Sequence, residues 1–175
     1  MPGADGIATR RGQRFAFELT TNVGNQQRAD AAVMMQEQLR KIGVAVTIRQ
    51  MEFNLLSDLL DQGKFDAVII GTAVDTGFDL ASTLGSKAIG GQNLSRYASP
   101  ELDGLIQRSM SHPDLAAALP DLHAIQELSQ REQFFTYLWE SQRLCAYNRR
   151  LHEVRSNPLR TYFELEDWWL EARQR

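Results

Sequence analysis

The sequence predicts an α/β fold with a mainly parallel sheet flanked by helices, because strand-like and helix-like segments alternate between residues 15 and 72. Apolar residues recur at every second position in residues 15–19 and 44–48, as in strands with one buried face. After each of these segments, apolar residues recur at spacings of three and four, as on one face of a helix. Residues 65–71 form a nearly continuous apolar run, which is typical of a strand covered on both sides. Two βαβ units in succession predict parallel strands with right-handed crossovers.

The first predicted strand turns Phe15, Phe17 and Leu19 to one face, and the polar turn of residues 21–25 follows it. The next helix carries its apolar stripe on Ala32, Met35, Leu39 and Ile42. We expect Gly43 to end this helix, since glycine is the common residue just past a helix C-terminus.

A second amphipathic helix, with its apolar stripe between Phe53 and Leu60, follows the second strand and is expected to end at Gly63. Parallel sheets bind ligands in the crevice beyond the carboxyl ends of their strands. The loops of residues 21–25 and 72–79 are therefore expected to hold binding residues.

The second half of the chain begins with an irregular, polar stretch between residues 71 and 100, and a long loop of this kind predicts a functional role. Ser99 followed by Pro100 predicts the start of a helix. Pro120 lies inside the next helical pattern and is expected to kink or split that helix. Aromatic and branched residues from 134 to 146 predict one or two strands.

Composition restricts the classes of function. The 175 residues fit one domain, and a net charge of −3 argues weakly against nucleic-acid binding. No stretch approaches the roughly 20 apolar residues that span a bilayer, and the first residues show no signal pattern, so the chain as given is expected to stay in the cytoplasm unless an upstream piece has been removed. Cys145 is the only cysteine and is expected to be buried, and His112, His123 and His152 lack metal-ligand spacing.

Motifs of catalysis are absent from the sequence: there is no GxSxG, HExxH, GxxxxGK[ST] or CxxC. Asp75 and Asp79, four residues apart in the loop after the third predicted strand, allow two interpretations. Spacing alone favours turn chemistry, because aspartate is common in loops. The alternative is a carboxylate that meets a cationic group of a ligand.

The chain also resembles the C-terminal lobe of extracellular solute-binding proteins of family 5, the peptide, oligopeptide and nickel binders of ABC importers. The matching stretches follow the family's order over nearly the whole chain. They are residues 17–28 (FELTTNVGNQQR), 35–44 (MQEQLRKIGV), 63–67 (GKFDA), 92–97 (QNLSRY), 100–106 (PELDGLI), 132–139 (EQFFTYLW) and 154–158 (VRSNP). Gln133 departs from the pattern, because the family commonly has a proline there.

The resemblance implies a type II periplasmic-binding-protein-like lobe over residues 1–175, with the ligand enclosed against an N-terminal lobe that is absent here. We therefore expect an excised fragment or a truncated or split gene product. In the family, the loop that matches residues 74–80 carries aspartates, one of which pairs with a peptide's ammonium group, so the resemblance favours Asp75 and Asp79 as ligand-binding residues. Asn93 and Tyr97 match a region that borders the cleft, although Tyr97 could instead close its loop onto the core.

Two further residues are weaker candidates for the cleft. Asn25 matches the turn after the first strand, where capping the following helix is the favoured role. Trp139 is a candidate cleft residue, but a position in the core is the favoured interpretation.

The function that the resemblance implies is a non-enzymatic binding lobe of a periplasmic or lipid-anchored receptor. Its partners would be a small solute such as a peptide, the N-terminal lobe of the same receptor and the membrane permease of an ABC importer, with no cofactor, metal or nucleic acid. The alternative is a stand-alone protein-interaction module that exposes an apolar face, with Tyr97 and the Trp168–Trp169 pair as its members. The sequence leaves the identity of the solute open.

Overall fold

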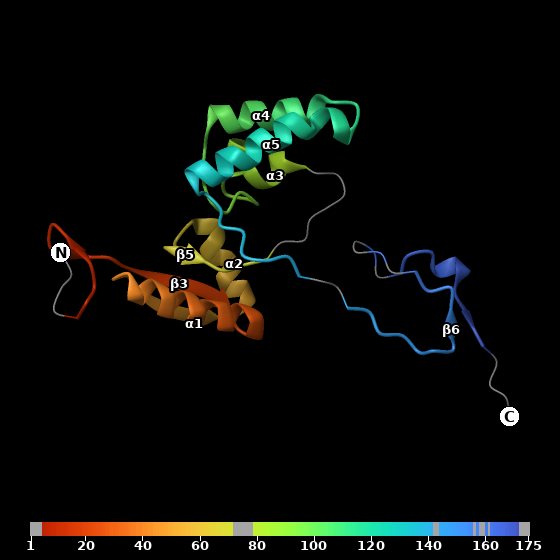
Figure 1. Cartoon of the computed structure of the whole chain (residues 1–175), viewed down its shortest axis with the longest axis horizontal. Helices are drawn as coiled ribbons and strands as arrows, with labels where there is room; N and C mark the ends of the chain where they lie inside the picture. The colour runs from red at the N-terminus through yellow and green to blue at the C-terminus, as the bar shows by residue number, and fades with distance from the viewer. Residues whose placement is uncertain are drawn as a thin grey trace. The chain divides into compact units, whose positions relative to one another are not determined.

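The computed structural model describes residues 5–71, 79–141, 144–155, 157, 160 and 162–171. These residues form two compact units (Figure 1). The N-terminal unit contains the described residues up to Gly71 together with Asp79–Phe134, and the C-terminal unit contains those from Phe135 onward. None of the helices in the described part of the chain is long and apolar enough to cross a bilayer.

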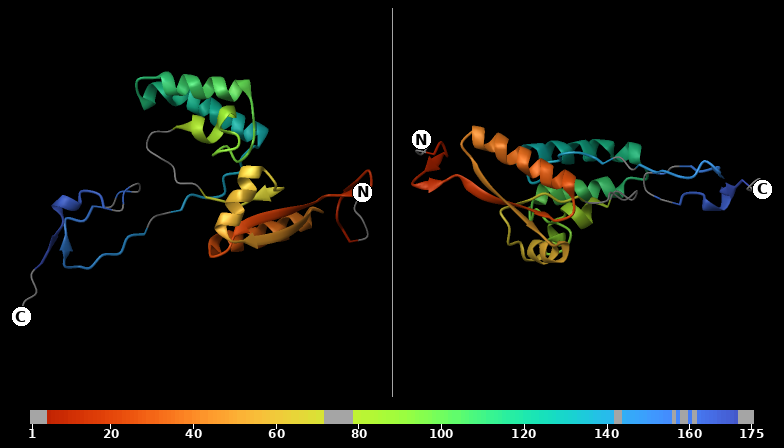
Figure 2. Two further views of the ribbon diagram at one scale, coloured as in Figure 1. Left: turned by 180° about the vertical axis from the view of Figure 1, so that it is seen from behind. Right: turned by 90° about the horizontal axis from the view of Figure 1, so that it is seen from below.

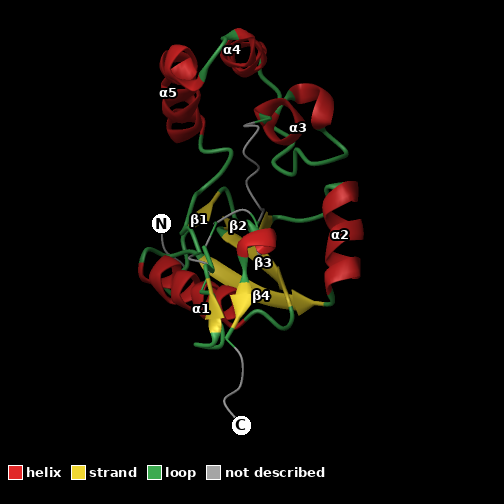
Figure 3. Ribbon diagram, turned by 90° about the vertical axis from the view of Figure 1, so that its right-hand side faces the viewer, coloured by secondary structure: helices red, strands yellow, loops and turns green. Residues whose placement is uncertain are grey.

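A parallel sheet of three strands organises the N-terminal unit. The strands β3 (Ala16–Asn22), β4 (Ala45–Met51) and β5 (Ala67–Val68) lie in the order β4-β3-β5. Ala16 to Asn22 pair in register with Ala45 to Met51, whereas β5 pairs with β3 only through its two residues. The helices α1 (Gln26–Lys41) and α2 (Phe53–Gln62) lie on opposite sides of the sheet (Figure 3). The predicted parallel sheet flanked by helices is therefore confirmed.

The hydrophobic core lies between α1 and the sheet. Its buried members are Leu19, Ala32, Val44, Val46 and Ile69. On the other side, α2 buries Leu56 and Leu60, two of the three apolar residues of its predicted stripe.

Glycine ends both crossover helices, as predicted. Gly43 follows α1 with a φ of 82°, and a Cβ built there would lie 3.2 Å from Ala8 N and 3.2 Å from Gly6 O. Gly63 ends α2 in the left-handed conformation with a φ of 65°. At Gly43 both the backbone angle and the close backbone neighbours require glycine.

Three apolar residues predicted to be buried in the α/β segment are exposed, and one of them is Phe53, the first residue of α2, at 52%. Phe15 is 58% exposed, because it lies in the connection between β2 (Gln13–Arg14) and β3. Ile42 is 71% exposed, because it caps α1 with non-helical backbone angles and so leaves the helical stripe. A short hairpin of β1 (Thr9–Arg10) with β2 precedes Phe15.

Four helical segments complete the N-terminal unit: α3 (Leu80–Leu84), the 3-10 turn η1 (Ser86–Ala88), α4 (Pro100–Ser111) and α5 (Leu115–Glu132). Ser99 caps α4 by accepting a bond from Leu102 N, so the start predicted there is confirmed, and Asp114 caps α5 by accepting a bond from Ala117 N. Of the two outcomes predicted at Pro120, the split is wrong, since α5 continues through this residue, and the kink stays a prediction. Pro120 lies early in this helix, where its missing N–H removes only one bond near the end of the ladder.

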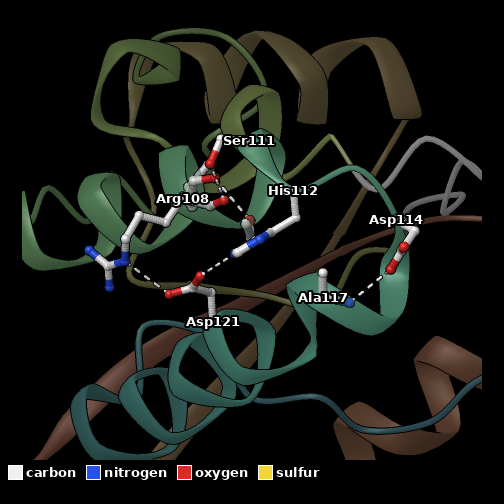
Figure 4. A network of polar contacts seen from close by, with 8 residues as sticks. Arg108, Ser111, His112, Asp114, Ala117 and Asp121 are labelled. Carbon is white, nitrogen blue, oxygen red and sulfur yellow. Dashed lines mark hydrogen bonds and ion pairs between the residues drawn. The ribbon is translucent and has the colours of Figure 1, made fainter.

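A polar network joins α4 to α5 near their connecting turn (Figure 4). The Asp121 carboxylate lies 3.0 Å from His112 Nε2 and accepts a bond of 3.0 Å from Arg108 Nε. Its side chain is only 17% exposed. The hydrogen bond from His112, and then that from Arg108, holds the pKa of Asp121 below its ordinary value of 3.8.

This network predicts an acid-dependent loss of stability. A carboxylate whose pKa is lower in the folded chain stabilises the fold above pH 3.8, and this stabilisation disappears as the pH falls through the lower, folded value. Asp121→Asn removes the contribution, so its melting temperature should approach that of the wild type at strongly acidic pH and lie below it near neutrality. Thermal unfolding from neutral to acidic pH checks this, with Glu127→Gln on the same helix as the matched control. A constant gap between Asp121→Asn and the wild type would contradict it.

The C-terminal unit contains little regular structure. The strands β6 (Leu151–His152) and β7 (Trp169–Leu170) pair antiparallel, and the 3-10 turn η2 (Leu165–Asp167) precedes β7. His152 stacks on Trp169 with ring centroids 4.1 Å apart.

The strands predicted between residues 134 and 146 are wrong for the residues that the structure describes there. Apolar β-forming side chains do not make a strand by themselves, because a strand also needs a regular ladder of backbone hydrogen bonds to a neighbouring strand. Leu144 is 91% exposed and Cys145 is also exposed, so the predicted burial of this cysteine is wrong.

Candidate functional site

The carboxyl edge of the sheet is built from polar groups with fixed positions. Asn22 ends β3, and the next residue, Val23, donates its N–H to Met51 O at the end of β4 at 2.8 Å. The buried Thr21 hydroxyl donates to Ile69 O at 3.0 Å and so ties β3 to the chain that leaves β5. These bonds hold the ends of all three strands together, at the edge where parallel sheets bind ligands.

Arg28 supplies a cation at this edge. Its side chain starts in the first turn of α1, and Nη1 donates to Asn22 Oδ1. Its Nη2 lies over Gly71, since a Cβ built on Gly71 would come within 2.8 Å of that atom. The half-buried guanidinium therefore extends from the end of β3 to the residue just before the loop of residues 72–78.

The N-terminus of α1 adds to this positive character. The first turn of a helix presents unpaired N–H groups and the positive end of the helix dipole. The first turn of α1 contains no acidic residue. A guanidinium beside a helix N-terminus favours a carboxylate or a polarised carbonyl oxygen as its ligand.

Asn25 occupies the N-cap position of α1, and its Oδ1 accepts a bond of 3.0 Å from Arg28 N. The favoured role of Asn25 as a helix cap is therefore confirmed. By fixing the first turn, Asn25 also positions Arg28. Direct contact between Asn25 and a ligand stays a prediction.

The structure describes one of the two aspartates predicted to bind the ligand. Asp75 lies outside the described residues. Asp79 is exposed and caps α3, where its carboxylate accepts bonds of 3.1 Å from Ala81 N and 3.2 Å from Ser82 N. The turn role of Asp79 is thus observed, and ligand contact by either aspartate stays a prediction.

Asn93 organises the loop between η1 and α4. Its side chain is 1% exposed and donates to Leu84 O, Gly85 O and Tyr97 O at 3.0–3.1 Å. Its Oδ1 accepts a bond of 2.8 Å from Ser95 Oγ. These bonds tie the loop to itself at Ser95 and Tyr97 and to the end of α3 at Leu84 and Gly85, so Asn93 supports the loop in this structure. A ligand contact by Asn93 stays a prediction.

The other two predicted aromatic residues lie in different units. Tyr97 is half-buried and stacks on Phe134 with ring centroids 4.5 Å apart, which matches the alternative that it closes its loop onto the core. Trp139 belongs to the C-terminal unit, where it is 46% exposed and donates from Nε1 to Ser141 Oγ at 3.2 Å. The predicted core position of Trp139 is therefore wrong, and cleft contact by either residue stays a prediction.

The structure thus joins Asn22, Asn25 and Arg28 at one edge and gives Asp79, Asn93 and Tyr97 roles in a separate segment. Sequence analysis missed Arg28 and Gly71. The sequence did contain a signal for Arg28. It lies three residues after the expected N-cap Asn25, and the third residue after a cap lies in the first turn of the helix, at the carboxyl edge of the sheet. Within the described ranges, no group of three His, Cys, Asp or Glu residues could hold a metal ion.

Comparison with known families gives one match over about half of the chain. Residues 2–90 match the family described as "Bacterial extracellular solute-binding proteins, family 5 Middle". Among curated proteins, the oligopeptide-binding protein AppA of Bacillus subtilis is 31% identical over 169 residues. This alignment covers 95% of the chain and 31% of AppA. Protein XP55 of Streptomyces lividans is 27% identical over 78% of the chain.

Solved structures give the same result. The structure of Bacillus subtilis AppA in complex with a nonapeptide matches 97% of the chain and 34% of its own length, with a TM-score of 0.80 and 30% identity. The oligopeptide-binding protein of Thermus thermophilus, in complex with a pentapeptide, matches 77% of the chain at a TM-score of 0.65 and 22% identity. NikZ of Campylobacter jejuni, in complex with Ni(L-His), matches 74% at a TM-score of 0.63 and 20% identity. The last two comparisons show the fold alone.

The chain spans about a third of AppA, and 26% of protein XP55.

Proposed function

The chain belongs to the bacterial extracellular solute-binding proteins of family 5, and on that premise we propose that it is the C-terminal lobe of a two-lobe receptor for a peptide-like solute. The link to a transporter is supported by a relative from Deinococcus radiodurans that is named a probable ABC transporter-binding protein. A peptide is the favoured solute class, because AppA, the relative that matches nearly the whole chain, is an oligopeptide-binding protein solved with a nonapeptide.

The observation that carries the proposal is the placement of Arg28 at the carboxyl edge of the sheet. Its guanidinium is held by Asn22, lies against the backbone at Gly71 and adjoins the N-terminus of α1. This arrangement suits a carboxylate or the carbonyl groups of an extended backbone, both of which a peptide offers. The ammonium group of the peptide would then meet Asp75 or Asp79 in the following loop.

The second lobe completes the site in this proposal. A ligand at the carboxyl edge of one sheet keeps its other side exposed unless another surface covers it. Closure of two lobes by a hinge would remove that side of the solute from water. The closed receptor would then deliver the solute to a membrane permease. The receptor would act outside the cytoplasm, as expected of an extracellular solute-binding family.

Nuclear magnetic resonance on the isolated chain tests where the solute binds. A peptide titrated into the ¹⁵N-labelled chain is expected to shift the backbone signals of Asn22, Asn25, Arg28 and Gly71. The signals of Lys41 and Ile42, at the other end of α1, should stay in place. Shifts confined to residues 135–171 would contradict the proposal. Larger shifts of the same four signals with Ni(L-His) than with the peptide would mean that the solute is a metal complex and not a peptide.

A stand-alone interaction module remains the second candidate. The observation in its favour is the exposure of large apolar side chains in the C-terminal unit, where Tyr137 is 76% and Leu144 is 91% exposed. Exposed apolar surface of this kind marks interfaces or aggregation-prone segments. A stable dimer in light scattering would favour this candidate over the receptor lobe.

A further inference from the structure

The amino-terminal edge of the sheet carries an exposed surface of mixed basic and apolar character. We call it the amino-edge patch, and it consists of Arg10, Arg11, Arg14, Phe15, Lys41 and Ile42. All six residues are exposed. Phe15 and Ile42 expose 58% and 71% of their surface.

Backbone hydrogen bonds bring these two chain segments together. Ala8, at the base of the β1–β2 hairpin, donates its N–H to Gly43 O at 2.7 Å, just after Ile42. Phe15 donates to Ala8 O at 2.8 Å and accepts from Ala45 N at 2.9 Å. The hairpin and the C-terminal end of α1 therefore lie at the same end of the sheet, as both Figure 1 and Figure 2 show. The exposure of Phe15 and Ile42 is thus imposed by a fixed backbone.

Positive charge exceeds negative charge around the patch. The hairpin turn itself is Arg11–Gly12, both with positive φ, so it projects Arg10 and Arg11 at a tight tip. Asp5 forms an ion pair with Arg14 and accepts a bond of 3.1 Å from Ile7 N. That backbone bond, with the nearby charges of Arg14 and Arg40, keeps the pKa of Asp5 below its ordinary value.

Further carboxylates lie near the patch. Glu37 lines a hollow of about 270 Å³ together with Arg40 on α1 and residues 44–46 of the sheet. Asp66, just before β5, accepts a bond of 2.9 Å from Glu18 N, and the Glu18 side chain forms an ion pair with Arg49. Because Arg40 accompanies Glu37 and Arg49 pairs with Glu18, the four cations of the patch remain in excess over Asp5 and Asp66. The patch is cationic although the whole chain has a net charge of −3.

We propose that the amino-edge patch docks on the anionic headgroup surface of a phospholipid bilayer, with Phe15 and Ile42 entering the interface between the cationic side chains. Basic side chains around exposed aromatic and aliphatic groups fit such a surface, since the charges meet lipid phosphates while the apolar groups leave water. A nucleic acid would satisfy the charges but would leave the aliphatic Ile42 in water, so the bilayer is the better occupant.

Docking through this patch leaves the candidate solute site open. Strand β3 begins beside the patch at Ala16 and ends at Asn22, so about 20 Å of sheet separates the two surfaces. The inference therefore stands independently of the proposed solute.

Co-sedimentation of the full chain with large unilamellar vesicles tests the proposal. Vesicles of phosphatidylglycerol and phosphatidylcholine in equal parts should bind the chain at low salt and release it at high salt, and pure phosphatidylcholine should not bind it. The triple variant Arg10→Glu, Arg11→Glu and Lys41→Glu should lower partitioning by on the order of a hundredfold. The double variant Phe15→Ser and Ile42→Ser, which keeps every charge, should lower it by roughly tenfold.

The matched control reverses three exposed cations elsewhere, Lys64→Glu, Lys87→Glu and Arg149→Glu, and should retain more than half of the wild-type binding. Circular dichroism verifies that each variant is folded; if the charge-reversed triple is not, the double variant and the salt series decide. The proposal is overturned if the wild type ignores anionic vesicles, if the control loses as much binding as the patch triple, or if the double variant binds undiminished. Tighter binding to a DNA duplex than to vesicles would overturn it as well.

Discussion

Arg28→Met is expected to weaken peptide binding by roughly thirtyfold, or about 2 kcal/mol, in a complete two-lobe receptor. A suitable receptor is a chimaera in which this chain replaces the matching 31% of Bacillus subtilis AppA, with the peptide affinity measured by calorimetry. The variant leaves the ligand's oxygen atoms facing an apolar side chain after they have left water. The cost of such an unpaired group accounts for most of the expected loss.

Two companion variants make the Arg28 result specific. Arg28→Lys keeps the charge but loses the planar fork that reaches both Asn22 and the backbone at Gly71, so it should fall between the wild type and Arg28→Met. Arg40→Met removes an exposed cation from the other end of α1 and should leave peptide affinity unchanged. Equal losses for Arg28→Met and Arg40→Met would mean that the carboxyl edge does not hold the peptide.

The first βαβ units could be predicted from the sequence because local signals and long-range packing agree there. Alternation in β3 and β4, the N-cap at Asn25 and the glycine after α1 each point to the same arrangement. The errors lie at the ends of elements. Ile42 continues the helical spacing of apolar residues in the sequence, yet it adopts non-helical backbone angles as the C-cap of α1 and is exposed.

The C-terminal unit could not be predicted because its apolar residues depend on partners that local pattern does not encode. Residues 134–146 have strand composition, but the described residues among them do not form a strand. Trp139 and Leu144 are correspondingly exposed. In the proposed receptor, apolar surface of this kind would face the rest of the protein.

The candidate site was only partly predictable. The sequence points to the correct edge of the sheet, because the carboxyl ends of parallel strands follow from the order of elements alone. It does not show that the Arg28 side chain folds back on Asn22. Nor does it show that the Asn93 amide donates to the carbonyl groups of Leu84 and Gly85 at the end of α3 and of Tyr97 in its own loop.

The dependence of affinity on a second lobe is the second large effect expected. Binding energy that closes a hinge must come from contacts to both lobes, so one lobe alone keeps only part of the interface. An isolated lobe that makes half of the contacts loses several kcal/mol, which corresponds to on the order of a thousandfold in affinity.

Calorimetric titration of the isolated chain and of the AppA chimaera with the same nonapeptide tests the central claim most directly. The account predicts at most weak binding by the isolated chain and binding roughly a thousandfold tighter by the chimaera. The Arg28→Met chimaera serves as a folded control, checked by its melting temperature. Submicromolar peptide binding by the isolated chain would contradict the account, because a single lobe would then be a complete receptor.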